Sequence, residues 1–207
     1  MTTPQAMPLV DTFGRRAKDL RLSITDRCNF RCTYCMPEEG LRWAAREALL
    51  TYEEIARVAR VAVERFGFDS LRITGGEPTV RAHLPTLVEL LAELGTDLAL
   101  TTNGVKLPEL AADLARAGLR RVNISLDSLR KDTFLRLTRR DGLDDVIRGI
   151  EAAVEAGLAP VKVNAVVIRG VNDDEVVDIA RFGRERGVSV RFIEFMPLDA
   201  DGEWTRD

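Results

Sequence analysis

The sequence predicts an α/β fold in which strands and helices alternate and a parallel sheet curves into an open, partial barrel. Two observations lead to this prediction. Short apolar or β-branched runs recur along the chain, and stretches with apolar residues at helical spacing lie between them. From the second run onward, the runs start roughly every 24 to 40 residues, a spacing that suits one strand and one crossover helix.

Six runs are expected to form the strands: 20–25, 70–75, 97–102, 121–127, 161–168 and 189–195. We expect these strands to be apolar on both faces more than they alternate, as in a parallel sheet covered by helices. A closed TIM barrel needs eight β/α units. The geometric expectation is therefore an open partial TIM-type barrel of about six parallel β/α units.

Five stretches are expected to form the helices between the strands: 52–66, 84–94, 107–118, 143–157 and 173–187. Four glycines follow four of these helices, where a left-handed cap is wanted: Gly95, Gly118, Gly157 and Gly187. Ligands of such folds gather at the carboxyl ends of the strands. Polar residues are concentrated after the expected strands at that rim, in 74–79, 101–104, 125–128 and 194–197.

The composition favours one globular domain, since 45% of the 207 residues are hydrophobic and 30% are charged. We divide the chain into a polar leader at 1–18, the barrel at 19–197 and the start of a further region at 198–207. Lysine and arginine (30) nearly balance aspartate and glutamate (33), which argues against a nucleic-acid partner. Without a signal-peptide core or a long apolar window, we expect the cytoplasm and no membrane partner.

The three cysteines lie together in CNFRCTYC, at Cys28, Cys32 and Cys35. Clustered cysteines in a reducing compartment indicate metal or redox chemistry, and sulfur ligands favour zinc or iron–sulfur. Both structural zinc and a 4Fe–4S cluster usually take four protein ligands, but the only histidine, His83, lies 48 residues past Cys35. We favour a cluster with one iron open to a small molecule over structural zinc and over buried cysteines without a metal.

Two features near the cysteines are ambiguous by themselves. Tyr34 lies between the second and third cysteines, where an aromatic ring can simply pack on the loop. The stretch ITGGEPTV ends the second strand in a Gly–Gly pair, which allows a ligand to approach the backbone closely. A tight turn between strand and helix explains the same pair without a ligand.

The cysteine motif, joined to GGEP about 40 residues later, resembles the radical S-adenosylmethionine (SAM) superfamily. Within that superfamily the chain resembles the GTP 3',8-cyclase family of molybdenum cofactor biosynthesis. The segments that carry this narrower resemblance are LRLSITDRCNFRCTYCMPEEG, LRITGGEPTVR, LTTNG, RVNISLDSL, KVNAVVIRGVND and RFIEFMP. The similarity runs from about Phe13 to Pro197, nearly the whole chain.

The resemblance implies a role for each matching residue. Cys28, Cys32 and Cys35 match the ligands of a 4Fe–4S cluster whose open iron binds SAM. The positions that match SAM contacts are Tyr34, Gly75, Gly76, Glu77, Pro78, Ser125 and Met196. The positions that match GTP contacts are Arg21, Arg72, Thr101 and Lys162. Guanidinium and ammonium groups suit a triphosphate, although without the resemblance they would be interpreted as surface charges.

The implied reaction is the radical cyclisation of GTP to (8S)-3',8-cyclo-7,8-dihydroguanosine 5'-triphosphate, a lyase reaction and the first step of molybdenum cofactor biosynthesis. The cluster and SAM carry the chemistry, and no other catalytic residue is expected. The resemblance implies an electron donor such as a flavodoxin-type reductant, and cyclic pyranopterin monophosphate synthase acting downstream. A homodimer is a further candidate assembly.

The chain departs from the family at its C-terminal end. Family members usually continue with a second three-cysteine motif and a second 4Fe–4S cluster, so that we expect one cluster in this chain. We also expect exposed apolar surface near the last strand. Three alternatives stay open: another radical SAM enzyme, for example a peptide-modifying one; a radical-generating fragment that is inactive on GTP; and a zinc-binding module without enzymatic activity.

Overall fold

The computed structural model describes residues 7–196. Its six strands form one sheet in which each strand pairs in parallel with the next along the chain. They are β1 (Asp19–Ser23), β2 (Ser70–Thr74), β3 (Asp97–Thr102), β4 (Arg121–Ser125), β5 (Val161–Val167) and β6 (Ser189–Glu194). The predicted α/β fold is confirmed, and each strand lies within about two residues of its expected range.

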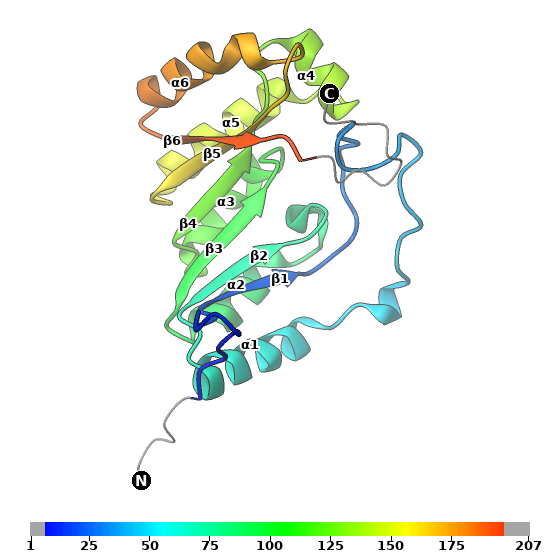
Figure 1. Ribbon diagram of the computed structural model, residues 1–207. Coiled ribbons are helices and arrows are strands. Elements are labelled where there is room, and N and C mark those ends of the chain that lie inside the picture. The colour runs from blue at the N-terminus through cyan, green and yellow to red at the C-terminus, as the bar shows by residue number, and fades with distance from the viewer. Residues whose placement is uncertain (1–6, 197–207) are drawn as a thin grey trace.

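Six helices lie between the strands: α1 (Tyr52–Phe66), α2 (Leu84–Ala92), α3 (Leu107–Arg116), α4 (Lys131–Thr138), α5 (Leu143–Glu155) and α6 (Val176–Glu185). Figure 1 shows the sheet curving from β1 to β6, with helices along its outer side and an open inner side. Short 3-10 turns occupy Arg46–Ala48, Pro78–Val80 and Asp173–Glu175. The sequence predicted every α-helix except α4.

The expectation that the strands are apolar on both faces is wrong for four of them. Burial largely alternates along β1, β2, β5 and β6, and only β3 and β4 have runs of buried residues. The buried positions, such as Leu71, Ile73 and Val163, pack into the core beneath the helices. The other face lines the inside of the barrel, and because the barrel is open this face can carry polar side chains.

The predicted glycine caps are confirmed. Gly95, Gly118, Gly157 and Gly187 all have positive φ, between 65° and 104°. The left-handed conformation ends each helix at little steric cost and turns the chain toward the next strand. Because all six strands run parallel, their carboxyl ends meet at one rim.

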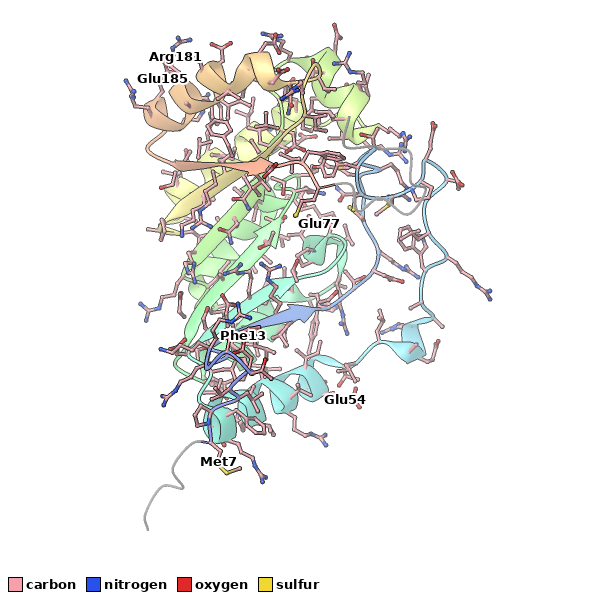
Figure 2. All side chains as sticks on the ribbon, viewed as in Figure 1. Met7, Phe13, Glu54, Glu77, Arg181 and Glu185 are labelled. Carbon is pink, nitrogen blue, oxygen red and sulfur yellow. The ribbon has the colours of Figure 1, made fainter. Side chains whose placement is uncertain are left out.

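Residues at both ends of the described range are exposed. Residues 7–18 form an exposed turn with an isolated antiparallel bridge between Val10 and Arg16, and Figure 2 shows Met7 and Phe13 there. Near the last strand Phe192 is 41% and Met196 is 60% exposed, as expected. The first six residues of the predicted leader, Pro197 and the predicted region 198–207 lie outside the described residues. The proposed domain boundaries stay a prediction.

No helix within residues 7–196 is long and apolar enough to span a membrane.

Candidate functional site

The three cysteines lie on the long loop that follows β1 and faces the carboxyl ends of the strands (Figure 1). All three are free thiols, with Cys28 and Cys32 half-buried and Cys35 exposed. Partial burial raises the pKa of each thiol above its ordinary value. The thiols are therefore neutral before a metal binds, and ligation as thiolates would release their protons.

The donors on this loop fit a 4Fe–4S cluster in kind, and their number would leave one iron without a ligand from the loop. Between residues 7 and 196, no group of three histidine, cysteine, aspartate or glutamate side chains could hold one metal ion. A 4Fe–4S cluster takes each thiolate on a different iron, so that its ligands need not converge on a single point. Sulfur donors on an irregular loop, with no disulfide among them, suit such a cluster.

Helix α4 supports the cysteine loop from one side. The backbone N–H groups of Arg31 and Thr33 donate to the carbonyl oxygens of Thr138 and Leu137, each at 2.9 Å. These carbonyls belong to the last turn of α4, where the helix itself offers them no partner. The ring of Phe30 packs edge-to-face on Phe134 of α4, with the centroids 5.7 Å apart. A helix that the sequence did not predict is thus the platform of the predicted cluster loop.

Two side-chain hydrogen bonds tie the same loop to the sheet. The amide of Asn103, just after β3, donates to Asn29 Oδ1 at 2.7 Å. The hydroxyl of Tyr34 donates to Asp127 Oδ2 at 2.5 Å, and the backbone N–H of Val166 donates to Asp127 Oδ1 at 2.8 Å. Burial raises the pKa of both Tyr34 and Asp127. The loop is therefore held by residues that follow β3 and β4.

The Gly–Gly pair after β2 lies against the segment that leads into the cysteine loop. The N–H groups of Gly76 and Glu77 donate to the carbonyl oxygens of Thr25 and Arg27, each at 2.7 Å. A Cβ atom on Gly75 would lie 2.5 Å from the Thr25 oxygen, and one on Gly76 would lie 2.5 Å from the Arg27 oxygen. The chain's own backbone already requires glycine at both positions, whether or not a ligand also approaches them.

Glu77 is 1% exposed and accepts four hydrogen bonds from the chain. Its Oε1 accepts from the N–H and hydroxyl of Thr79, at 2.9 and 2.6 Å, and from the hydroxyl of Thr102 at 2.7 Å. Its Oε2 accepts from the N–H of Asn103 at 2.6 Å. Figure 2 shows Glu77 at the turn after β2. Through these hydrogen bonds the carboxylate connects this turn to the end of β3, a role that the sequence did not indicate.

A polar cavity of about 220 Å³ opens on the inner face of the sheet. Three of the four residues predicted to contact GTP line it: Arg21, Arg72 and Thr101. The fourth, Lys162, pairs in register with Asn123, another lining residue. Partial burial, together with the charges of Arg191, Arg121 and Arg72, lowers the pKa of Lys162. The structure thus gathers the predicted cations on one face.

The charges on this inner face of the sheet are only partly balanced. Arg72 forms an ion pair with Asp19 at 2.9 Å, and Arg121 Nε donates to Asp97 Oδ1 at 2.7 Å. Arg21 and Arg191 form no ion pair with any residue in the described range. The inner face therefore favours an anion.

Sequence reasoning missed Asn123, Asn164 and Arg191, which line the cavity with the predicted residues. The two-residue period of β4, β5 and β6 could have predicted these residues, because it places them on the same face of the sheet as Lys162. The assumption that both faces are apolar concealed this alternation.

Three further predicted SAM contacts, Ser125, Pro78 and Met196, are not among the residues that line this cavity. Ser125 ends β4 and pairs in register with Asn164, while Pro78 is buried at the start of a 3-10 turn. Met196 is the last described residue. Their predicted contacts with SAM stay predictions.

Comparisons with known proteins identify the superfamily to which the chain is similar. A model of the radical SAM superfamily matches residues 22–183. The chain is 53% identical to a GTP 3',8-cyclase of Paenarthrobacter nicotinovorans over 203 residues, covering 96% of this chain and 56% of that protein. It is 54% identical to a GTP 3',8-cyclase of Streptomyces coelicolor, covering 96% of this chain and 59% of that protein. The chain thus spans little more than half the length of these curated relatives.

Solved structures share the fold at low identity. Streptococcus suis SuiB bound to S-adenosylmethionine superposes with a TM-score of 0.74 at 17% identity, covering 92% of this chain and 43% of SuiB. Methylornithine synthase superposes with a TM-score of 0.68 at 16% identity, covering 88% of this chain and 54% of that structure. These similarities support the partial barrel and carry no argument about substrate.

Proposed function

Since the chain belongs to the radical SAM superfamily, whose members use a 4Fe–4S cluster and SAM, we propose that it cyclises GTP at the 3' and 8 positions. The product would be (8S)-3',8-cyclo-7,8-dihydroguanosine 5'-triphosphate, in the first step of molybdenum cofactor biosynthesis. The observation that carries the proposal is the cationic inner face of the barrel, formed by Arg21, Arg72, Lys162 and Arg191. The relatives named GTP 3',8-cyclase, above 50% identical over nearly the whole chain, support the same substrate.

In this proposal Cys28, Cys32 and Cys35 hold the cluster, and the turn with Gly75 and Gly76 helps to receive SAM. When bound, the cluster and SAM supply one-electron cleavage of the sulfonium and thereby a radical that removes a hydrogen atom from the substrate. One cluster is proposed for this chain. Tyr34, Glu77, Pro78, Ser125 and Met196 remain proposed SAM contacts.

The residues of the chain bind and orient the substrate. Arg21, Arg72 and Lys162 offer the cationic donors that a triphosphate requires. Thr101 adds a hydroxyl donor in the same cavity. Helices cover the outer side of the sheet, so that the substrate would reach these groups from the open inner side.

The experiment reconstitutes the chain anaerobically with iron and sulfide, and adds SAM, GTP and a strong reductant. Both 5'-deoxyadenosine and cyclised nucleotide are then quantified. The proposal expects both products, and expects Arg21→Gln to weaken GTP binding at least tenfold, the loss of one charged hydrogen bond or more. Arg16→Gln, in the exposed N-terminal turn, is the matched control and should bind GTP as the unmodified chain does.

A second candidate function is radical generation without cyclisation. It requires the cysteine loop, whose three free thiols could hold the cluster, but not the cationic inner face. In that case 5'-deoxyadenosine forms and cyclised nucleotide does not. If neither 5'-deoxyadenosine nor cyclised nucleotide forms, both candidate functions are contradicted.

The partners follow from the proposed reaction. A flavodoxin-type protein would donate the electron, and cyclic pyranopterin monophosphate synthase would consume the product. A cytoplasmic location and a homodimer remain proposals.

A further inference from the structure

The cysteine loop belongs to a segment of irregular backbone. No helix or strand lies between the end of β1 at Ser23 and the 3-10 turn that begins at Arg46. Long loops of this kind adopt many conformations unless side-chain contacts fix them. Ligands that must meet one cluster benefit from a loop that is already ordered, because less conformational entropy is then lost when the cluster binds.

Asp127 is placed to provide such order. It is 5% exposed and lies two residues past the end of β4. Its two carboxylate oxygens have different partners: Oδ1 accepts from the backbone of Val166 on β5, and Oδ2 accepts from the hydroxyl of Tyr34. One oxygen therefore fixes the carboxylate to the sheet, and the other is free to hold the loop.

Tyr34 is the residue through which this hold reaches the cysteines. It lies directly between Thr33 and Cys35, one residue after the N–H that bonds to the end of α4. The next N–H, of Cys35, donates to the carbonyl of Cys32 at 2.9 Å, so that the backbone turns tightly around Tyr34. Fixing the Tyr34 phenol thus fixes the direction in which this turn presents Cys32 and Cys35.

We propose that Asp127 is a positioning residue, which holds the cysteine loop on the sheet through the phenol of Tyr34 before any cluster is bound. The inference rests on the proposed role of this loop as the cluster site. It assigns to Asp127 no contact with SAM or GTP. It also accounts for a buried carboxyl group beside the cysteine loop, because its two oxygens accept hydrogen bonds from Val166 and Tyr34.

The neighbouring network supplies a matched control. Glu175 is also buried, and its carboxylate accepts from the hydroxyl of Ser128 at 2.7 Å and from the N–H of Leu129 at 2.8 Å. It fixes the segment after β4 to the start of α6 without a hydrogen bond to the cysteine loop. A change at Glu175 therefore tests loss of a buried carboxylate at the same rim.

The test measures hydrogen exchange of residues 28–35 in the metal-free chain, for Tyr34→Phe, Asp127→Asn, the double variant and Glu175→Gln. Tyr34→Phe removes a single oxygen, which keeps the test valid if Asp127→Asn folds poorly. We expect Tyr34→Phe and Asp127→Asn each to speed the exchange of residues 28–35 roughly tenfold, the effect of losing one hydrogen bond to a charged group. The double variant should match the singles, and Glu175→Gln should leave this segment unchanged.

The second readout is the iron and sulfide bound per chain after anaerobic reconstitution, with the electron paramagnetic resonance spectrum of the reduced sample before and after SAM. Tyr34→Phe and Asp127→Asn should lower the cluster content or the SAM-induced change, and Glu175→Gln should not. Unchanged exchange in Tyr34→Phe, or additive effects in the double variant, would overturn the inference. A third outcome separates the two proposals. If exchange speeds in the variants but the unmodified chain binds no cluster, the positioning role of Asp127 is supported and the proposed function is contradicted.

Discussion

Glu77 illustrates how a motif residue can have a structural role that its motif does not reveal. The sequence places it in GGEP, where the family resemblance implies a contact with SAM. In the structure its carboxylate is buried and accepts hydrogen bonds from Thr79, in the turn after β2, and from Thr102 and Asn103 at the end of β3. An acceptor that joins two strand ends is sensitive to any replacement that adds a donor.

Glu77→Gln is expected to lower the free energy of unfolding by about 2 kcal/mol, because the new NH₂ group would face the N–H of Asn103 and leave a buried donor unpaired. Urea denaturation of the metal-free chain measures this change. Glu89→Gln, on the exposed side of α2, is the control and should change stability by less than about 0.5 kcal/mol. Equal stability of Glu77→Gln and Glu89→Gln would show that the hydrogen bonds of the Glu77 carboxylate do not stabilise the fold.

The glycine pair makes a separate prediction. Gly76→Ala would place a Cβ atom 2.5 Å from the carbonyl oxygen of Arg27, a backbone atom that cannot move aside cheaply. We expect a loss of about 2 to 3 kcal/mol in the metal-free chain. Gly142→Ala, whose Cβ would lie 3.4 Å from Phe30 Cε1, should cost much less. A well-tolerated Gly76→Ala would mean that this glycine serves only a ligand.

Lys162 lies among like charges, and its lowered pKa reflects its partial burial and that repulsion. Removing the charge with Lys162→Met should raise the unfolding midpoint of the ligand-free chain by roughly 1 to 3 °C. The same variant should bind inorganic tripolyphosphate more weakly. Lys106→Gln, exposed at the start of α3, should do neither. A lower unfolding midpoint in Lys162→Met would contradict the claim that repulsion from the neighbouring arginines destabilises the chain.

At the scale of elements, α4 shows where sequence periodicity stops being informative. Its eight residues, KDTFLRLT, contain only a few apolar positions, which a loop of that length can contain as well. For the longer helices, which have several turns of apolar residues at helical spacing, the predicted ends lie within a few residues of the observed ends. The helix forms because Phe134 and Leu137 are buried and its last carbonyls meet the cysteine loop. Both causes are tertiary and cannot be inferred from the segment itself.

If α4 is the platform of the cysteine loop, Phe134→Leu should loosen that loop. The variant keeps an apolar side chain but removes the edge-to-face contact with Phe30, at an expected cost of about 1 to 2 kcal/mol. Hydrogen exchange of Arg31 and Thr33 should speed accordingly. Leu135→Ala, exposed on the same helix, is the control. Exchange that is equally slow in both variants would contradict this role of α4.

At the scale of the whole molecule, strand order, parallel pairing and the open barrel could be predicted, because each β/α unit follows from local patterns of 2 and 3.6 residues. The polar inner face could not be predicted under the assumption of a sheet covered on both sides. The hydrogen bond between Tyr34 and Asp127 joins residues 93 positions apart, and no local pattern encodes such a pair. The functional residues were predicted by motif resemblance, and the residues that hold them required the structure.

The central claim is that the cysteine loop carries a 4Fe–4S cluster with one iron open to SAM. The most direct test is metal and sulfide analysis of the anaerobically reconstituted chain, with electron paramagnetic resonance of the reduced sample before and after SAM is added. We predict about four iron and four sulfide per chain and a spectrum that changes on addition of SAM. Zinc without sulfide, or a spectrum that SAM leaves unchanged, would contradict the account.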